Sequence, residues 1–259
     1  MTTIIPLYPH PILLLENSNE EKYLVITDIH IGYKENNLEL GVLIEQKKII
    51  EEMLDILINI ANENKIKNLI ILGDLKSSTK IITKVEWKYV RYFLSSLSTI
   101  YNIYLIPGNH DGNLNYLIPN NTINLISAKG MELYDTLLTH GHIIPKIGEN
   151  INKIITGHLH PRFIKDGSIL NGQKVWIRII LERSIKNHEK DIEFIVIPQF
   201  DKNINYFENK SRGKTKLPLL NNLIMKKNWK ISQAFIISLD GSIMGSKDEL
   251  NMMIQNTNP

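Results

Sequence analysis

The sequence predicts an α/β domain built in layers. Hydrophobic residues make up 43% of its 259 residues and charged residues 22%, a balance typical of a chain that buries a globular core. Short apolar runs alternate with amphipathic helical segments in the first part of the chain, and more strand-like runs follow residue 160. This order predicts a sheet covered by helices and packed against further strands.

Four apolar runs, each ending in polar side chains, set the frame of the first 160 residues. They are Tyr23–Asp28, Leu69–Asp74, Ile103–Asn109 and Thr136–His142. Runs of this length that are rich in Ile, Leu and Val predict buried strands. Between the first two runs, Leu43, Ile50, Met53, Leu54, Leu57 and Ala61 recur at helical spacing. A second helix is predicted over Lys84–Thr99, and the β-α-β-α-β order supports the layered class.

Beyond residue 160 the pattern changes. The runs Val175–Leu181, Ile192–Pro198 and Ala234–Asp240 predict strands of a second sheet packed on the first, with a lysine-rich connector over Asn209–Lys216. Only the residue pattern changes here, because no clear linker separates the two parts of the chain. We therefore predict a single domain over residues 1–259, with a core over about residues 23–160 and C-terminal strands and an extension over 161–259.

Composition excludes several classes of site. The chain has no cysteines, which excludes disulfides, zinc–thiolate sites and thiol nucleophiles and leaves any metal to His, Asp, Glu and Asn. The formal net charge of +3 selects no class of partner. The N-terminal segment lacks a basic region, and its apolar stretch Ile12–Leu15 is too short to cross a membrane. We predict a cytoplasmic protein that does not contact a membrane.

Six of the eight histidines follow predicted strands, in the segments DIH, GNHD, HGH and GHLH. Taken singly, each segment also fits a turn or a helix N-cap. Taken in order at strand ends, the segments predict loops that converge on one rim of the fold. Carboxylates and imidazoles gathered there would be unfavourable without compensating cations.

This motif set, D-x-H, G-D, G-N-H-D, H-G-H and G-H-x-H over about residues 23–160, resembles the calcineurin-like metallophosphoesterase superfamily. The forms TDIHIGY, GDLKS and GHLHP, with a later strand ending IPQF, are most similar to its SbcD-related and ligase-associated predicted phosphoesterases. The resemblance implies a four-layer α-β-β-α sandwich with two mixed β-sheets flanked by helices. It also implies an enzyme that hydrolyses phosphate esters with the help of metal ions.

The resemblance assigns roles by motif to two divalent cations and to one acid. Asp28, His30 and His160 would bind the first cation, Asn109, His140 and His158 the second, and Asp74 both. This mixed donor set favours Mn²⁺, with Fe²⁺, Zn²⁺ or Co²⁺ as alternatives. His110 would protonate or stabilise the leaving oxygen and Asp111 would orient its ring, the alternative being a turn-forming His-Asp pair.

Three further residues near the motifs are candidates for binding substrate. Lys76 departs from the G-D-x-x-D/N pattern of many relatives, and it either binds a phosphate or lies in solvent. His142 either lies behind the second cation or only packs, and Arg162 is a candidate because it follows GHLHP.

The predicted function is hydrolysis of phosphodiesters in DNA or RNA. The alternatives are a phosphomonoesterase, a cyclic-nucleotide or dinucleotide hydrolase, and a non-catalytic scaffold of the same fold. A nuclease needs a basic, aromatic-lined groove, for which Tyr33, Lys34 and Lys80 are candidates with Lys76 and Arg162. A homodimer or an ATPase partner, as in SbcD-type nucleases, finds no support in the sequence, which shows no long coiled-coil segment.

Overall fold

Two mixed β-sheets pack face to face between helices in this computed structural model, which describes residues 1–33, 42–119, 123–165, 167–185, 188–201 and 218–250. The first sheet has the order β1 (Thr3–Pro6), β2 (Leu13–Glu16), β3 (Lys22–Ile26), β4 (Asn68–Ile71), β5 (Asn102–Leu105) and β6 (Ile123–Leu125). Strands β1 to β3 pair antiparallel, whereas β3 to β6 run parallel.

The second sheet has seven strands and is also mixed. Its order is β13 (Ile243–Gly245), β12 (Lys230–Ser238), β10 (Val175–Ile185), β11 (His188–Val196), β9 (Lys153–Thr156), β8 (Thr136–Thr139) and β7 (Met131–Leu133). Strands β8, β9 and β11 are parallel, and the other pairs are antiparallel.

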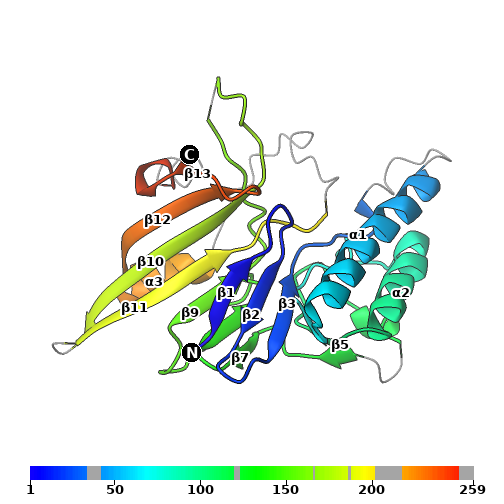
Figure 1. Cartoon of the computed structure of the whole chain (residues 1–259), viewed down its shortest axis with the longest axis horizontal. Coiled ribbons are helices and arrows are strands. Elements are labelled where there is room, and N and C mark those ends of the chain that lie inside the picture. The colour runs from blue at the N-terminus through cyan, green and yellow to red at the C-terminus, as the bar shows by residue number, and fades with distance from the viewer. Residues whose placement is uncertain (34–41, 120–122, 166, 186–187, 202–217, 251–259) are drawn as a thin grey trace.

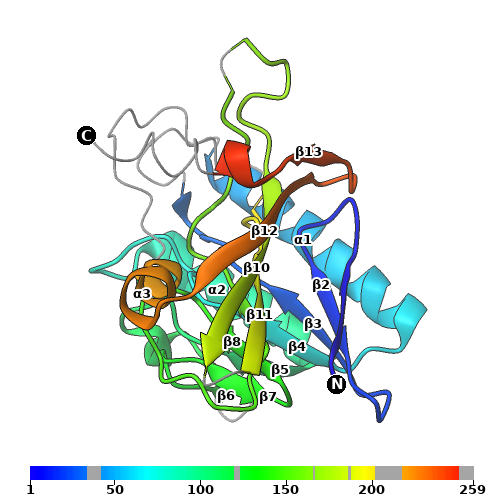
Figure 2. The ribbon, with the colours of Figure 1, turned by 90° about the vertical axis from the view of Figure 1, so that its left-hand side faces the viewer.

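Helices cover the outer faces of both sheets. Helices α1 (Val42–Asn64) and α2 (Lys84–Ser98) lie on the first sheet, and α3 (Pro218–Lys227) lies on the opposite side of the molecule with the long strands β10 to β12. Figure 2, turned by 90°, again places α1 and α3 on opposite sides. A short 3-10 helix, η2, spans Leu114–Tyr116.

Three separate apolar clusters define the four layers. The first joins β3, β4 and β5 to α1 and α2, and includes Leu57 and Phe93. The second lies between the sheets, where Val25 and Ile70 meet Ile155 and Ile195. The third joins the second sheet to α3. The predicted α-β-β-α sandwich is confirmed.

The predicted helix over Lys84–Thr99 begins and ends within one residue of α2. Thr83 and Glu86 form a capping box at its start, which satisfies backbone N–H groups that have no partner within the helix.

Two parts of the fold differ from the prediction. The N-terminal hairpin β1–β2 was not predicted, and the second sheet begins at β7, before the change of texture near residue 160. The side chain of Leu43 and the stretch Asn209–Lys216 lie outside the part of the chain that the structure describes. Within that part, every helix is too short or too polar to cross a bilayer.

Candidate metal centre

The polar ends of strands from both sheets meet at one rim. His158 follows β9 of the second sheet, and Asp28 follows β3 of the first sheet. The backbone N–H of His158 donates to Asp28 Oδ2 at 2.9 Å. Similarly, His140 follows β8 and Leu72 follows β4, and Nδ1 of the His140 ring lies 2.7 Å from the Leu72 carbonyl oxygen. The predicted convergence therefore occurs, but it joins two facing sheets and not only neighbouring strands of one.

The backbone at this rim is held in an unusual conformation. Five of the seven predicted ligands have φ between 48° and 68°: Asp28, His30, Asp74, His158 and His160. Left-handed φ values cost residues other than glycine on the order of 1–3 kcal/mol each and concentrate at functional sites. The surrounding contacts therefore hold these turns where their side chains point inward.

Two glycines allow the turns to approach each other. A Cβ added to Gly157 would lie 1.9 Å from Thr27 Oγ1 and 2.6 Å from Asp28 Oδ2. A Cβ added to Gly108 would lie 2.1 Å from Asp74 Oδ1. Any other residue at these positions would displace a carboxylate of the site.

The first cluster consists of Asp28, His30, Asp74 and His160, which offer ligand atoms within 4.8 Å of one another. His160 Nε2 lies 2.9 Å from Asp28 Oδ1 and 3.2 Å from His30 Nε2. Two ring nitrogens and a carboxylate oxygen this close repel one another unless a proton or a cation lies among them. The donor set, two imidazoles and two carboxylates, fits a borderline divalent cation.

The second cluster consists of Asp74, His140 and His158, so Asp74 belongs to both clusters. His140 Nδ1 faces the Leu72 carbonyl at 2.7 Å and must donate a hydrogen there, so Nε2 is the nitrogen that could bind a cation. His140 Nε2 faces two acceptors, Asn109 Oδ1 at 3.2 Å and Asp74 Oδ2 at 3.3 Å. Two acceptor oxygens facing Nε2 require a positive charge between them, which either a proton on the ring or a bound cation supplies.

Both carboxylates are ionised at neutral pH. Burial acts to raise the pKa of Asp28, but the rings of His160 and His140 outweigh it and hold this pKa below its usual range. Burial likewise opposes ionisation of Asp74, and a hydrogen bond with His140 lowers its pKa to about 2. Two buried negative charges therefore face the same small space.

Two of the imidazoles are neutral at the same pH. Burial, and then the neighbouring His160, lower the pKa of His30 to about 3. Burial and His140 lower the pKa of His158 to about 4. Burial also acts on His140, but its bond with Asp74 outweighs this and raises the pKa to about 9, so a cation would have to displace the proton on Nε2. His30 and His158 thus have free lone pairs, as metal ligands must.

The ring of His110 borders the first cluster and is partly open to solvent. Its side chain is 28% exposed, and Nε2 lies 3.9 Å from Asp74 Oδ2. Its Nδ1 donates to the carbonyl oxygen of Ser77, and its backbone N–H donates to Asp74 Oδ1 at 2.9 Å. Nε2 therefore faces the first cluster.

The structure corrects the role predicted for Asp111. Its buried carboxylate accepts hydrogen bonds from the backbone N–H groups of Gly108, Leu75 and Lys76, at 2.8, 3.0 and 3.3 Å. Burial and the nearby Asp74 raise its pKa to about 6. Asp111 thus ties two loops together, and the Ser77 carbonyl orients the His110 ring in its place.

The prediction that Lys76 binds substrate or lies in solvent is wrong. Its side chain is fully buried, and its ammonium group donates to the carbonyl oxygens of Ser78 and, at 2.5 Å, His110. The stem of a lysine packs well in an apolar interior when its charged end finds acceptors. Lys76 therefore links the loop after β4 to the loop that carries His110.

Glu86 was not singled out in the sequence, although it completes this arrangement. Its buried carboxylate accepts from the backbone N–H groups of Ser77, Ser78 and Thr83, at 3.0, 2.7 and 2.9 Å. It thereby fixes the segment whose carbonyl holds His110. The T-x-x-E spacing at the predicted helix start was the available signal.

His142 and Arg162 lie at the borders of the site. The ring of His142 packs edge-on against His140 with centroids 5.2 Å apart, and its Nδ1 is buried without a hydrogen bond among the described residues. Arg162 donates to the Gly172 carbonyl oxygen at 2.7 Å. Lys34 lies outside the described residues.

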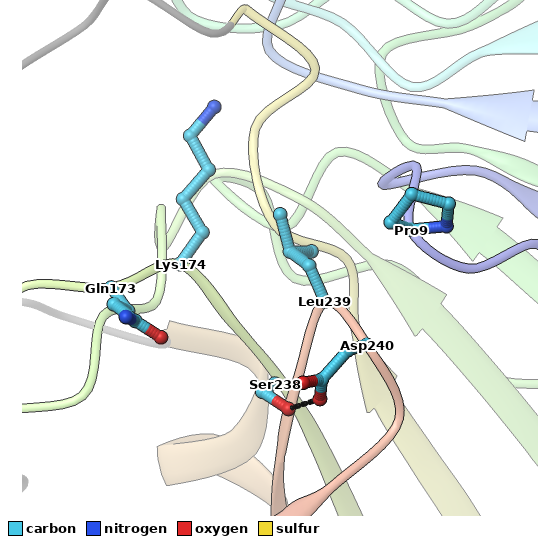
Figure 3. A pocket seen from close by; sticks show the side chains of 6 residues that line it. All are labelled: Pro9, Gln173, Lys174, Ser238, Leu239 and Asp240. Carbon is cyan, nitrogen blue, oxygen red and sulfur yellow. Dashed lines mark hydrogen bonds between the residues drawn. The ribbon is translucent and has the colours of Figure 1, made fainter. Parts of the chain in front are cut away.

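A separate pocket is lined by Pro9, Gln173, Lys174, Ser238, Leu239 and Asp240, with a volume of about 320 Å³. Figure 3 shows Gln173 and Lys174 on one side and Pro9 on the other. The Lys174 ammonium donates to backbone carbonyls of Gln199, at 3.1 Å, and Asp201. None of the clustered Asp and His side chains lines this pocket.

Comparison with known proteins decides the family. A family model described as calcineurin-like phosphoesterase matches residues 21–192, which is more than half of the chain and includes both clusters. The chain belongs to the calcineurin-like phosphoesterase family. As a calcineurin-like phosphoesterase it is a hydrolase that acts on ester bonds, and its Asp and His clusters can hold divalent metal ions.

Solved structures with a similar arrangement include two enzymes. The nuclease MPE from Pseudomonas putida is 19% identical, with a TM-score of 0.47, and the match covers 78% of this calcineurin-like phosphoesterase and 88% of that chain. YfcE, a phosphoesterase from E. coli, is 15% identical, with a TM-score of 0.41 and coverage of 86% and 97%. A search of curated protein sequences finds no match.

Proposed function

We propose that this chain is a two-metal phosphodiesterase that cleaves nucleic acid. The observation that carries the proposal is that Asp74 belongs to both ligand clusters. Asp28, His30, Asp74 and His160 would hold one cation, and Asp74, Asn109, His140 and His158 the other. A shared carboxylate offsets the repulsion between two neighbouring cations, which a histidine or an amide could not do.

Manganese is the cation we propose, because imidazole, amide and carboxylate donors together suit a borderline ion. Two bound divalent cations supply activation of a water molecule and neutralisation of charge on the phosphate. The protein's own contribution is a rigid rim. Thr27 Oγ1 lies 2.8 Å from Asp28 Oδ2, and the loops meet where Gly108 and Gly157 leave room.

His110 is proposed to protonate the leaving oxygen. Its Nδ1–H is committed to the Ser77 carbonyl, so Nε2 is the nitrogen that faces substrate. To act as an acid the ring must carry a proton on Nε2 as well, and this nitrogen lies 3.9 Å from Asp74 Oδ2, at the edge of both clusters. The Ser77 bond holds the ring in this orientation.

Nucleic acid is the proposed substrate because the sequence motifs resemble those of SbcD-related nucleases. The same metal chemistry serves monoesters and cyclic or dinucleotide diesters, so the substrate needs a direct test.

The test is hydrolysis of bis(p-nitrophenyl) phosphate, p-nitrophenyl phosphate and single-stranded oligonucleotides by the purified chain with added Mn²⁺. We expect turnover of the diester and of the oligonucleotides, lost on chelation and in Asp74→Asn. Turnover of the monoester alone would replace the proposal with a phosphomonoesterase. No metal-dependent turnover of any of the three would refute it.

A further inference from the structure

One face of α2 carries cations and aromatic rings without exposed acids. Lys84, Trp87, Lys88 and Arg91 follow helical spacing and are all exposed. Tyr116 of η2 lies beside them, since Arg91 donates to its carbonyl oxygen at 3.3 Å. We call these five residues the basic–aromatic face.

The cations of this face are not balanced by acids on the same helix, as they usually are on an exposed helix surface. The one acid of α2, Glu86, is buried. On α1, by contrast, Lys47 and Lys48 are interspersed with Glu51, Glu52 and Asp55, and Lys47 pairs with Glu51 at 3.3 Å. An unbalanced row of cations attracts a polyanion.

The position of Lys84 in α2 works against helix stability. Lys84 is the first residue of the helix, and no basic residue lies in its last turn. Cations near a helix N-terminus are disfavoured by the helix dipole, whereas the last turn would favour them. The stability of α2 therefore does not explain a lysine at this position, whereas a bound anion would.

Trp87 is the exposed exception among three tryptophans. Trp176 and Trp229 are 2% and 5% exposed, whereas Trp87 is 48% exposed and Tyr116 is 67% exposed. The Arg91 guanidinium lies 5.5 Å from the Trp87 ring centroid, which holds both side chains in place. Exposed rings among cations form a stacking platform for unpaired bases.

The face begins beside the metal centre. The carboxylate of Glu86 binds Ser77 and Ser78 on one side and Thr83, the residue before Lys84, on the other. Ser77 in turn touches the ring of His110. Lys80, also exposed, lies in the connecting loop.

We propose that the basic–aromatic face binds single-stranded nucleic acid and leads it to the metal centre. The cations contact successive phosphates, and Trp87 and Tyr116 stack on bases. Duplex fits less well, because its bases are already stacked on each other and hide their faces. This proposal rests on the proposed nuclease function.

The test uses the metal-loaded full chain and a phosphorothioate oligothymidylate of about ten nucleotides, within the site sizes of single-strand binders. Because Trp87 is the exposed tryptophan, binding should quench the tryptophan fluorescence. The quench should disappear in Trp87→Phe, and Trp87→Ala should weaken binding by about 5- to 100-fold.

Lys84→Gln combined with Arg91→Gln tests the cations. We expect binding at least about tenfold weaker and a slope of log K against log salt that is shallower by about 1.4, or about 0.7 for each lost contact. The matched control is Lys65→Gln with Lys67→Gln, two exposed lysines before β4, at the opposite end of that strand from Asp74. The control should bind like the wild type.

Bis(p-nitrophenyl) phosphate, which is too small to span the face, separates the two proposals. Suppose that the wild type hydrolyses this diester but Lys84→Gln/Arg91→Gln binds the oligonucleotide as tightly as the control. The proposed role of the basic–aromatic face is then refuted, and the proposed phosphodiesterase activity is not. Equal binding of duplex, or binding without a quench, would also refute the face. Absence of turnover in the wild type would count against the proposed function instead.

Discussion

Replacing Lys76 by methionine tests how the site holds His110. The substitution keeps an unbranched side chain that is one atom shorter, but it removes both hydrogen bonds, to the carbonyl oxygens of Ser78 and His110. Each buried carbonyl left without a donor costs about 1–3 kcal/mol. Removing a buried charge offsets part of this cost. We expect a net loss of about 2–3 kcal/mol in unfolding free energy, or roughly 5–10 °C in melting temperature.

The effect on turnover should be larger than the stability loss suggests. Without the ammonium, the loop that carries His110 is no longer tied to the loop after β4. A displacement of about 1 Å at a catalytic group costs on the order of 10²-fold in rate. The loss should be greatest for diesters with poor leaving groups, since p-nitrophenolate departs without a proton.

The assay is kcat for a series of aryl diesters under conditions where the variant is folded. Lys67→Met, at an exposed lysine, serves as the control and should match the wild type. In a His110→Ala background, Lys76→Met should add little. Equal losses for good and poor leaving groups, or a full additional loss in that background, would refute the claim that Lys76 acts through His110.

Three further predictions concern single residues. His110→Ala should keep its bound metal by elemental analysis while kcat for a poor leaving group falls by about 10²–10⁴-fold, and loss of metal would contradict its role as an acid. Gly157→Ala should lose metal as well as activity, because the new Cβ would displace Asp28 Oδ2, 2.6 Å away. Burial opposes the ionisation of Asp135, but hydrogen bonds from Lys153 and Thr2 lower its pKa to about 2. A lowered pKa stabilises the fold above the unfolded value of 3.8, so Asp135→Asn should cost about 1–2 kcal/mol at neutral pH in denaturant titrations. The difference should shrink below about pH 4, and a constant difference down to pH 3 would contradict this assignment.

The motifs could be read from the sequence because each lies directly after an apolar run. Asp28, Asp74 and His140 follow strands whose length and composition mark them as buried, and parallel strands bring their carboxyl ends to one edge. Helix α2 could also be predicted, from the helical spacing of its apolar residues.

Other elements depend on contacts between distant parts of the chain. Strand β1 has four residues and none of them is buried, so only one strand of the β1–β2 hairpin is a buried apolar run. Strand β9 pairs with β11, which lies some forty residues further along the chain. The local sequence of β9 therefore does not show to which sheet this strand belongs.

The predictions for Lys76 and Asp111 were wrong for the same reason. The environment of Lys76 depends on where the carbonyls of Ser78 and His110 point, and that of Asp111 on three converging N–H groups. A residue pattern records the side chain but not the backbone dipoles that surround it.

The most direct test of the two-metal centre is anomalous diffraction from crystals of the Mn²⁺-loaded chain. We expect two manganese peaks in each molecule, both bound by the carboxylate of Asp74. A single peak, or two peaks that do not share Asp74, would contradict the two-metal site from which the proposed function is derived.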